Sequence, residues 1–192
     1  MSDKRSKLQV IAEEIASCQS CDLSKTRTHA VPGEGNPDAQ LVLVGEGPGA
    51  QEDVKGRPFV GRSGKLLDEI ISVNGVFTRE DLFITNVVKC RPPENRTPLP
   101  NEIAACSHYL IGQLDTLRPK AVLCLGSTAS QMLTGQQIAL GRLRGRNLAG
   151  LKPAIIVTYH PSYGLRMGEP IVKLMASDYA LAVKFALGNN HA

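Results

Sequence analysis

The sequence predicts a three-layer α/β fold, in which helices cover both faces of a central, mainly parallel four-stranded sheet. Short apolar runs of strand length alternate along the chain with segments of helical spacing, and the crossovers between strands are long enough to hold a helix. Pro and Gly, with 12 and 18 residues, cluster between these segments as loops. The 192 residues are enough for a single domain, 1–192, with a substantial core.

The first two elements are a helix and a strand. Residues 8–17 have helical spacing, because Leu8, Ile11 and Ile15 fall on one face of a 3.6-residue repeat. Residues 40–44 form an apolar run with the length of a buried strand.

Two helices flank a second strand in the middle of the chain. Residues 64–73 repeat apolar side chains at helical spacing, and residues 82–88 form the second expected strand. Residues 101–114 are expected to be the third helix, with Asn101 as its N-cap and Glu102 in its first turn.

The last third supplies two more strand and helix pairs. We expect strands over 120–125 and 153–158, a short helix over 127–133 and a closing helix over 171–187. Ligands of open parallel sheets bind beyond the carboxyl ends of the strands. The residues that directly follow each strand are therefore the candidates for a functional site.

Composition excludes two classes of protein. The longest apolar runs are far shorter than a membrane span, and the polar N-terminus is followed by no secretory apolar region, so we expect a cytoplasmic protein without a membrane partner. Five Cys in such a chain argue against a disulfide scaffold.

The net charge of +4 is concentrated near the C-terminus. Residues 1–135 carry 15 Lys and Arg against 16 Asp and Glu, whereas residues 136–192 carry 7 against 2. A basic region on an otherwise balanced protein indicates either a polyanion partner such as nucleic acid or a solvated basic face.

Four of the five Cys predict a metal centre, with unconnected buried thiols as the alternative. Cys18 and Cys21 form a C-x2-C chelate, and Cys90 and Cys106 offer two further thiols. This second pair does not repeat the spacing of a zinc ribbon, so zinc and an iron–sulfur cluster both stay open. Cys124 lies inside an apolar strand and is expected to be a core residue.

A glycine-rich loop, GEGPG at 45–49, follows the first strand. It matches neither the dinucleotide fingerprint nor a Walker A loop, and no helix is expected directly after it. Its glycines allow a planar ligand to approach backbone N–H groups. Phe59, in the next loop, is either a core plug or a platform on which a base stacks.

Several motifs together resemble one known family. They are GEGPG at 45–49, Glu52-Asp53, GRPFVGRSG at 56–64, TNVVKCRPP at 85–93 and HPS at 160–162. In these motifs the chain is similar, over nearly its whole length, to the family 4 uracil-DNA glycosylases, the iron–sulfur members of the uracil-DNA glycosylase superfamily. Gly47 departs from the pattern, since many members have Ala there. The stretch RPPENRTP at 91–98 disfavours the related glycosylases that bind uracil-DNA covalently, which carry a basic insert with His at this place.

The resemblance implies a uracil-DNA glycosylase-like fold. It also implies a monofunctional enzyme that flips uracil out of DNA and hydrolyses its N-glycosidic bond, which starts base excision repair. It also implies a structural [4Fe–4S] cluster on Cys18, Cys21, Cys90 and Cys106. The expected partner is uracil-containing DNA, single- or double-stranded, and the expected oligomeric state is a monomer.

The resemblance also assigns roles in the site. Asn86 would read the uracil edge, because its amide offers one donor and one acceptor, and Phe59 would stack on the ring. His160 would stabilise the charge that develops on uracil O2, and Glu46 would orient water or exclude the thymine methyl group. The expected uracil-binding set is Gly45, Glu46, Gly47, Phe59, Asn86 and His160, with Glu46 and His160 catalytic.

Five residues are expected to contact DNA. Leu165 lies in what resembles the family's intercalation loop and would fill the gap left by the flipped base, with Arg166 on a phosphate. Arg142, Arg144 and Arg146 would bind further phosphates, or else form a solvated hairpin.

Two alternatives stay open, and a third is disfavoured. A non-enzymatic DNA-binding module with a structural metal site would share the cysteines and the basic region. A glycosylase of the same fold would act on another deaminated base, such as hypoxanthine. A small hydrolase using Ser127 is disfavoured, because no Gly-x-Ser-x-Gly elbow surrounds that residue.

Overall fold

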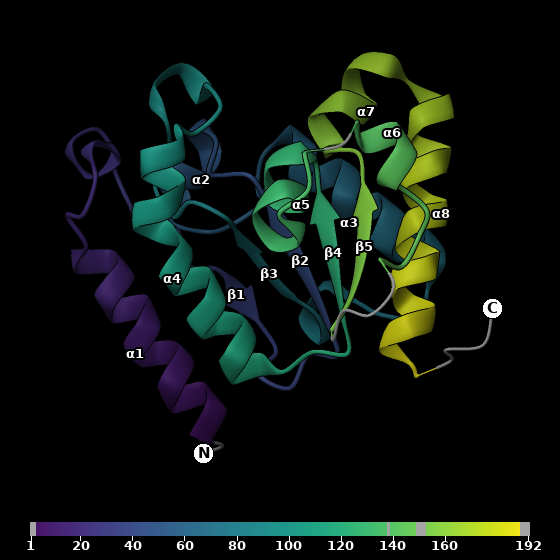
Figure 1. The fold of residues 1–192 in the computed structure, drawn as a ribbon, viewed down its shortest axis with the longest axis horizontal. Coiled ribbons are helices and arrows are strands. Elements are labelled where there is room, and N and C mark those ends of the chain that lie inside the picture. The colour runs from purple at the N-terminus through teal and green to yellow at the C-terminus, as the bar shows by residue number, and fades with distance from the viewer. Residues whose placement is uncertain (1–2, 138, 149–152, 189–192) are drawn as a thin grey trace.

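A mixed, mostly parallel five-stranded sheet forms the centre of the protein, which we describe from a computed structural model covering residues 3–137, 139–148 and 153–188 (Figure 1). The strands lie in the order β1-β3-β2-β4-β5. Four of them run parallel, and β1 pairs antiparallel with β3 at one edge. The strands are β1 (Glu34–Gly35), β2 (Leu41–Gly45), β3 (Phe83–Asn86), β4 (Ala121–Leu125) and β5 (Ala154–Thr158).

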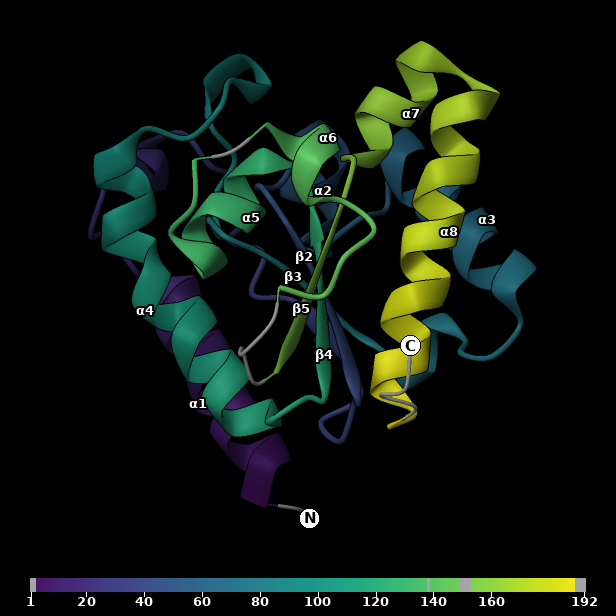
Figure 2. The same ribbon diagram turned by 45° about the vertical axis from the view of Figure 1, so that its right-hand side comes forward.

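Helices cover both faces of this sheet, which confirms the predicted three-layer α/β class (Figures 1 and 2). The α-helices are α1 (Asp3–Ser17), α2 (Ala50–Lys55), α3 (Arg62–Asn74), α4 (Pro100–Leu117), α5 (Ser127–Thr134), α6 (Leu140–Leu143), α7 (Pro161–Met167) and α8 (Glu169–Ala186). Single 3-10 turns are η1 (Asp22–Lys25), η2 (Arg79–Asp81) and η3 (Pro93–Asn95). In the part of the chain that is described, none of the helices is long and apolar enough to cross a membrane.

The two faces of the sheet bury separate apolar cores. Side chains alternate between the faces along a strand. Val42 and Val44 accordingly face the layer of α1, α4 and α5, whereas Leu41 and Leu43 face α3 and α8. All residues of β2, β4 and β5 are buried, as expected for strands covered on both sides.

The sheet has five strands rather than the predicted four. The extra strand, β1, is only two residues long, too short for any alternation of apolar side chains to reveal it. Gly35 has φ 136°, and a Cβ at this position would lie 2.0 Å from the Leu82 carbonyl oxygen. The close approach of the edge strand to β3 therefore requires glycine here.

Three helical features also differ from the prediction. Helix α2 starts directly after Gly49, although no helix was expected there, and the short helices α6 and α7 were not predicted. Helix α4 begins at Pro100, so Leu99 and not Asn101 is its N-cap. The Glu102 carboxylate accepts the Leu99 N–H at 2.7 Å, which takes the place of a polar N-cap side chain.

Candidate active site

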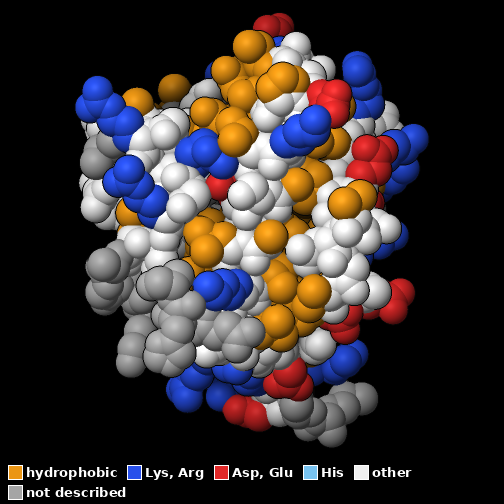
Figure 3. Space-filling view, turned by 90° about the vertical axis from the view of Figure 1, so that its right-hand side faces the viewer, with side chains coloured by type: hydrophobic (Ala, Val, Ile, Leu, Met, Phe, Trp, Pro, Cys, Tyr) orange, Lys and Arg blue, Asp and Glu red, His pale blue; other side chains and the backbone are white. Residues whose placement is uncertain are grey.

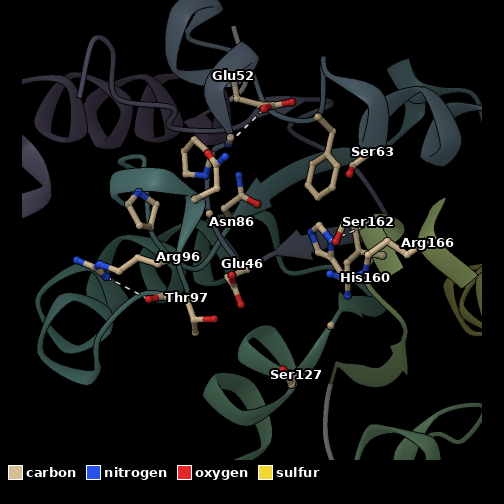
Figure 4. Close-up of a pocket in the computed structure, with 18 residues that line it drawn as sticks. Glu46, Glu52, Ser63, Asn86, Arg96, Thr97, Ser127, His160, Ser162 and Arg166 are labelled. Carbon is tan, nitrogen blue, oxygen red and sulfur yellow. Dashed lines mark hydrogen bonds between the residues drawn. The ribbon is translucent and has the colours of Figure 1, made fainter. Parts of the chain in front are cut away.

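A cavity of about 470 Å³ opens at the carboxyl ends of the parallel strands (Figure 4). The loops after β2, β3, β4 and β5 all contribute to its wall, together with the loop before α3. It is lined by Glu46, Gly47, Pro48, Gly49, Glu52, Phe59, Ser63, Asn86, Pro92, Asn95, Arg96, Thr97, Leu125, Gly126, Ser127, His160, Ser162 and Arg166. The structure thus brings together most of the predicted uracil-binding residues, which the sequence spreads over more than a hundred positions.

Asn86 ends β3 at the floor of this cavity. Its side chain is buried, and Oδ1 has no hydrogen-bond partner among the described residues. A buried amide oxygen without a partner is costly unless a ligand supplies one. The Asn86 amide oxygen is therefore free to accept a hydrogen bond from a ligand in the cavity.

Gly45 lies beneath the cavity rather than in its wall. A Cβ at this position would come within 2.4 Å of Asn86 Oδ1 and 2.6 Å of Phe59 Cζ. Its backbone is not in the left-handed region, so the requirement for glycine is one of space. The absence of a side chain lets the amide and the ring lie close together.

Phe59 holds its ring beside the cavity through an uncommon backbone conformation. Its φ is 50°, in the left-handed region that bulky residues seldom adopt, and such outliers are frequent at functional sites. A Cβ on Gly64 would lie 1.9 Å from the Phe59 carbonyl oxygen, so the first turn of α3 packs directly against this backbone. The Phe59 ring centre is 6.1 Å from that of His160.

His160 is neutral and presents Nε2–H for donation. It is the N-cap of α7, and its Nδ1 accepts the Ser162 backbone N–H at 3.2 Å, with the Ser162 hydroxyl at 2.8 Å. Since a backbone N–H can only donate, Nδ1 carries no proton. Burial, and then the charge of Arg166, lowers the pKa of His160 to about 4, while Glu52 opposes the shift.

The Glu46 carboxylate also reaches into the cavity, directly after β2 (Figure 4). The Thr128 hydroxyl, from the first turn of α5, donates to its Oε2. Thr128 is buried, so its hydroxyl restricts the position of the carboxylate. The sequence alone gave Thr128 no role, because Thr128 and Glu46 are 82 positions apart.

Glu52, to which the sequence motifs assigned no role, links the loop after β2 to the loop before α3. One carboxylate oxygen accepts the Gly49 N–H at 3.1 Å, and the other accepts the N–H groups of Val60 and Gly61 at 2.9 and 2.8 Å. The spacing of Gly49 and Glu52 is that of a capping box at the start of α2, which is the signal that sequence reasoning missed.

The four predicted metal-ligating cysteines surround one small second cavity. Cys18 and Cys21 follow α1, Cys90 follows β3, and Cys106 lies on α4. Within the described ranges, no three His, Cys, Asp or Glu side chains gather closely enough to hold a single metal ion. Cys124 is buried elsewhere, in β4, as predicted for a core residue.

Hydrogen-bond donors point at the sulfur atoms. Arg27 Nη1 donates to Cys90 Sγ at 2.9 Å, and the Lys89 backbone N–H donates to Cys106 Sγ at 3.3 Å. Burial raises the pKa of Cys90, with Arg27 opposing, and raises the pKa of Cys106 to about 11. Such donors offset the negative charge of sulfur when a thiolate binds a metal.

The predicted DNA-contacting residues do not form one group. Arg144 donates to the buried Asp178 at 2.7 and 3.0 Å, which makes it a structural ion-pair residue and not a free phosphate ligand. Burial raises the pKa of Asp178, while hydrogen bonds from Thr158 and Arg144 oppose the shift. Arg142 and Arg146 are exposed, but Arg142 lies in α6 and not in a hairpin.

Leu165 and Arg166 lie on the helix α7 and not in the expected loop. Both are exposed, and Leu165 and Met167 are among the exposed apolar side chains of the protein. Figure 3 shows the face with α7 and α8, where apolar side chains gather next to Lys and Arg at the upper end. Arg166 also lines the cavity, so this surface continues into the site.

Comparison with known proteins agrees with this geometry. Residues 32–178 match the uracil DNA glycosylase superfamily, which is the class that the fold and the site define. A type-4 uracil-DNA glycosylase of Thermotoga maritima is 46% identical over 183 residues, covering 93% of this chain and 94% of that protein. That of Saccharolobus solfataricus is 43% identical over 190 residues, covering 95% and 87%. A type-5 uracil-DNA glycosylase of Pyrobaculum aerophilum is 32% identical over 150 residues, covering 69% and 65%. The chain belongs to the type-4 uracil-DNA glycosylases.

Proposed function

We propose that the protein flips uracil out of DNA, binds it between Phe59, Asn86 and His160, and hydrolyses its N-glycosidic bond in base excision repair. One observation carries this assignment of the site. The buried Asn86 Oδ1 lacks a partner among the described residues, beside an aromatic ring and a neutral imidazole in one cavity. Such a group fits the edge of an extruded base.

Base selection follows from the Asn86 amide. Its Oδ1 accepts the uracil N3–H, and its NH2 group donates to O4. Cytosine presents the opposite pattern on this edge, so it would leave two polar groups unpaired in a buried place. The Phe59 ring stacks on the face of the base, which is a contact that any base can make. Asn86 therefore discriminates against cytosine, and Phe59 adds affinity.

Bond cleavage is assisted by charge stabilisation at the leaving base. The electron pair of the C1′–N1 bond leaves with uracil, and negative charge develops on O2. His160 Nε2–H donates to that oxygen, and the backbone N–H of Gly47 adds a second donor. Water then adds to C1′ of the oxocarbenium-like sugar, and its released proton balances the charge of the uracil anion. Glu46, held by Thr128, orients this water.

We propose that Cys18, Cys21, Cys90 and Cys106 hold a [4Fe–4S] cluster. The four thiols enclose a cavity rather than a single point, and the donors of Arg27 and Lys89 face two of them. When bound, the cluster supplies a covalent cross-link between the segment after α1, the loop after β3 and helix α4. Its role is structural, because it braces the loop that follows Asn86.

The exposed Arg142, Arg146 and Arg166 are proposed to bind DNA phosphates, with Leu165 entering the gap left by the base. We also propose that the protein acts as a monomer in the cytoplasm, on single- or double-stranded DNA.

The test is incubation of the purified protein with oligonucleotides that contain one uracil, thymine or hypoxanthine, followed by alkali to cleave abasic sites. Strand cleavage is expected with uracil only, in single and double strands, and it should fall at least about 100-fold in His160→Ala. Cleavage mainly at hypoxanthine would assign another base, and no cleavage would leave a binding module.

A separate measurement tests the cluster. Chemical analysis should find four iron and four acid-labile sulfide ions per chain, as a [4Fe–4S] cluster requires. The visible spectrum should show broad absorption in the blue region. Cys106→Ser should lower both the iron content and the melting temperature. Zinc in place of iron would contradict the cluster assignment while leaving the glycosylase assignment intact.

A further inference from the structure

Lys89 is a buried lysine that the mechanism above does not use. Its side chain is 1% exposed, and Nζ lies 2.7 Å from Thr85 Oγ1, 2.7 Å from the Asn86 carbonyl oxygen and 2.8 Å from Gln113 Oε1. An ammonium has three N–H donors, and here each has a neutral acceptor. Burial lowers the pKa of Lys89 to about 7, and the Cys106 thiol opposes the shift.

On one side, β2 supports the end of β3. There, the N–H groups of Val87 and Val88 donate to the carbonyls of Gly45 and Glu46 at 2.9 and 3.1 Å. On the other side, the edge strand β1 pairs only with residues 83 and 84.

The next backbone hydrogen bond on that side is from the Val31 N–H to the Lys89 carbonyl at 2.7 Å, and a proline explains why none reaches Asn86. Continuing the β1 register by two residues would place Pro32 opposite Asn86, and proline has no N–H to donate. The Lys89 ammonium lies on the Asn86 carbonyl instead. It takes the place of the missing sheet neighbour at the residue that reads the base.

The ammonium is itself anchored to two other parts of the fold. Gln113, buried on α4, donates through Nε2 to the Pro32 carbonyl at 2.6 Å and accepts from Lys89 through Oε1. The Thr85 hydroxyl accepts from Lys89 and lies 3.1 Å from the Pro32 carbonyl. The peptide of Asn86 is therefore connected through Lys89 to α4 and to the loop before β1.

We propose that Lys89 is a positioning residue for base recognition, which holds the Asn86 peptide so that the side-chain amide faces the uracil edge. The inference rests on the proposed function, since it concerns how Asn86 meets the base. Without the ammonium, the Asn86 carbonyl is buried and unpaired, and its peptide can rotate. A small rotation there displaces the amide at the end of the side chain.

A double-mutant cycle tests whether Lys89 acts through Asn86. Single-turnover uracil excision is measured for the wild type, Lys89→Met, Asn86→Ala and the double variant, each purified with its cluster and matched for iron content. Methionine keeps the length of the side chain and removes its donors. The exposed Lys120→Met, directly before β4 at the amino end of the parallel strands, is the control.

Lys89→Met should lower the single-turnover rate of uracil excision about 10- to 100-fold, the cost of one buried unpaired group. In the Asn86→Ala background the same change should cost less than about threefold, because the amide it positions is gone. An equal loss in both backgrounds, or wild-type activity of Lys89→Met, would overturn the proposal. A wild type that releases no uracil would instead contradict the proposed function itself.

Gln113→Met provides a second route if Lys89→Met does not fold. It removes one acceptor of the ammonium and its brace to Pro32, and leaves Lys89 in place. A smaller loss that again disappears in the Asn86→Ala background supports the proposal. A loss that persists in that background contradicts it.

Discussion

The backbone N–H of Ser162 donates to Nδ1 of His160 across 3.2 Å. The bond is a helix N-cap: His160 precedes α7, Pro161 at the first helical position has no N–H, and the next N–H is the first that needs an acceptor. The start of an ordinary helix thus fixes the tautomer of the imidazole and aims Nε2–H at the cavity. The HPS motif therefore has a structural role, which is to hold His160 in the tautomer that donates through Nε2.

Titration of His160 should therefore cause no change in uracil excision between about pH 8 and pH 5. The pKa of His160 is lowered to about 4, so the ring stays neutral through that range. Protonation of Nδ1 would place two donors against each other and turn the ring away. Single-turnover rates across pH measure this directly, and a fall centred near pH 6.5 that disappears in His160→Asn would contradict it.

The same shift predicts a loss of stability on acidification. The unfolded imidazole binds a proton near its ordinary value of 6.5, whereas the folded one does so only near 4. Between these values the unfolded state holds more protons, so the free energy of unfolding falls as pH drops through this window. Urea unfolding at pH 7 and pH 5 should show a smaller decrease in His160→Gln than in the wild type.

Gly45→Ala should abolish recognition without unfolding the protein. The added Cβ would lie 2.4 Å from Asn86 Oδ1, so the amide must move out of place. We expect kcat/KM for uracil to fall about 100-fold. Gly112→Ala is the control, because its Cβ would meet Ile11 at 3.5 Å, an ordinary contact. Equal activity of the two variants would remove Gly45 from the site.

Thr128→Val should impair catalysis by releasing the Glu46 carboxylate. Valine keeps the shape of threonine and lacks the hydroxyl that donates to Oε2. The rate should fall about tenfold, and Thr128→Ser should restore most of it. Glu46→Ala is expected to lose activity about 100-fold. Gain of thymine excision in Glu46→Ala would assign this carboxylate to exclusion of the methyl group instead.

Arg142 and Arg144 should differ in role, the first acting in DNA binding and the second in stability. Arg142→Ala should reduce the salt dependence of DNA binding by about one phosphate contact, with unchanged base choice. Arg144→Ala should instead destabilise the protein by about 3 kcal/mol, because it leaves the Asp178 carboxylate buried without an opposite charge. Salt titrations and denaturant unfolding distinguish them. A normal stability of Arg144→Ala would contradict the structural role.

Much of the fold followed from local pattern. The four parallel strands and the longer helices are predictable because each has enough apolar residues to show its period. The two-residue strand β1 and the four-residue helix α6 carry no such signal. Helix α2 was missed because its start is set by a glutamate that caps it from within, and not by a polar residue before it.

Motifs in the sequence pointed to residues that line the cavity, and not to the residues that support them. Phe59, Asn86 and His160 follow from motifs, and their placement around one cavity agrees with the roles proposed for them. Thr128 and Gln113 support the site across long sequence separations, where no pattern marks them. The ion pair of Arg144 with Asp178, 34 residues away, is likewise not visible from the sequence.

The most direct test of the account is a crystal structure of the protein with free uracil. The account predicts the ring stacked on Phe59, with O2 within hydrogen-bond distance of His160 Nε2 and the N3–H and O4 edge on the Asn86 amide. Uracil bound elsewhere in the cavity, or with its O2 away from His160, would contradict it.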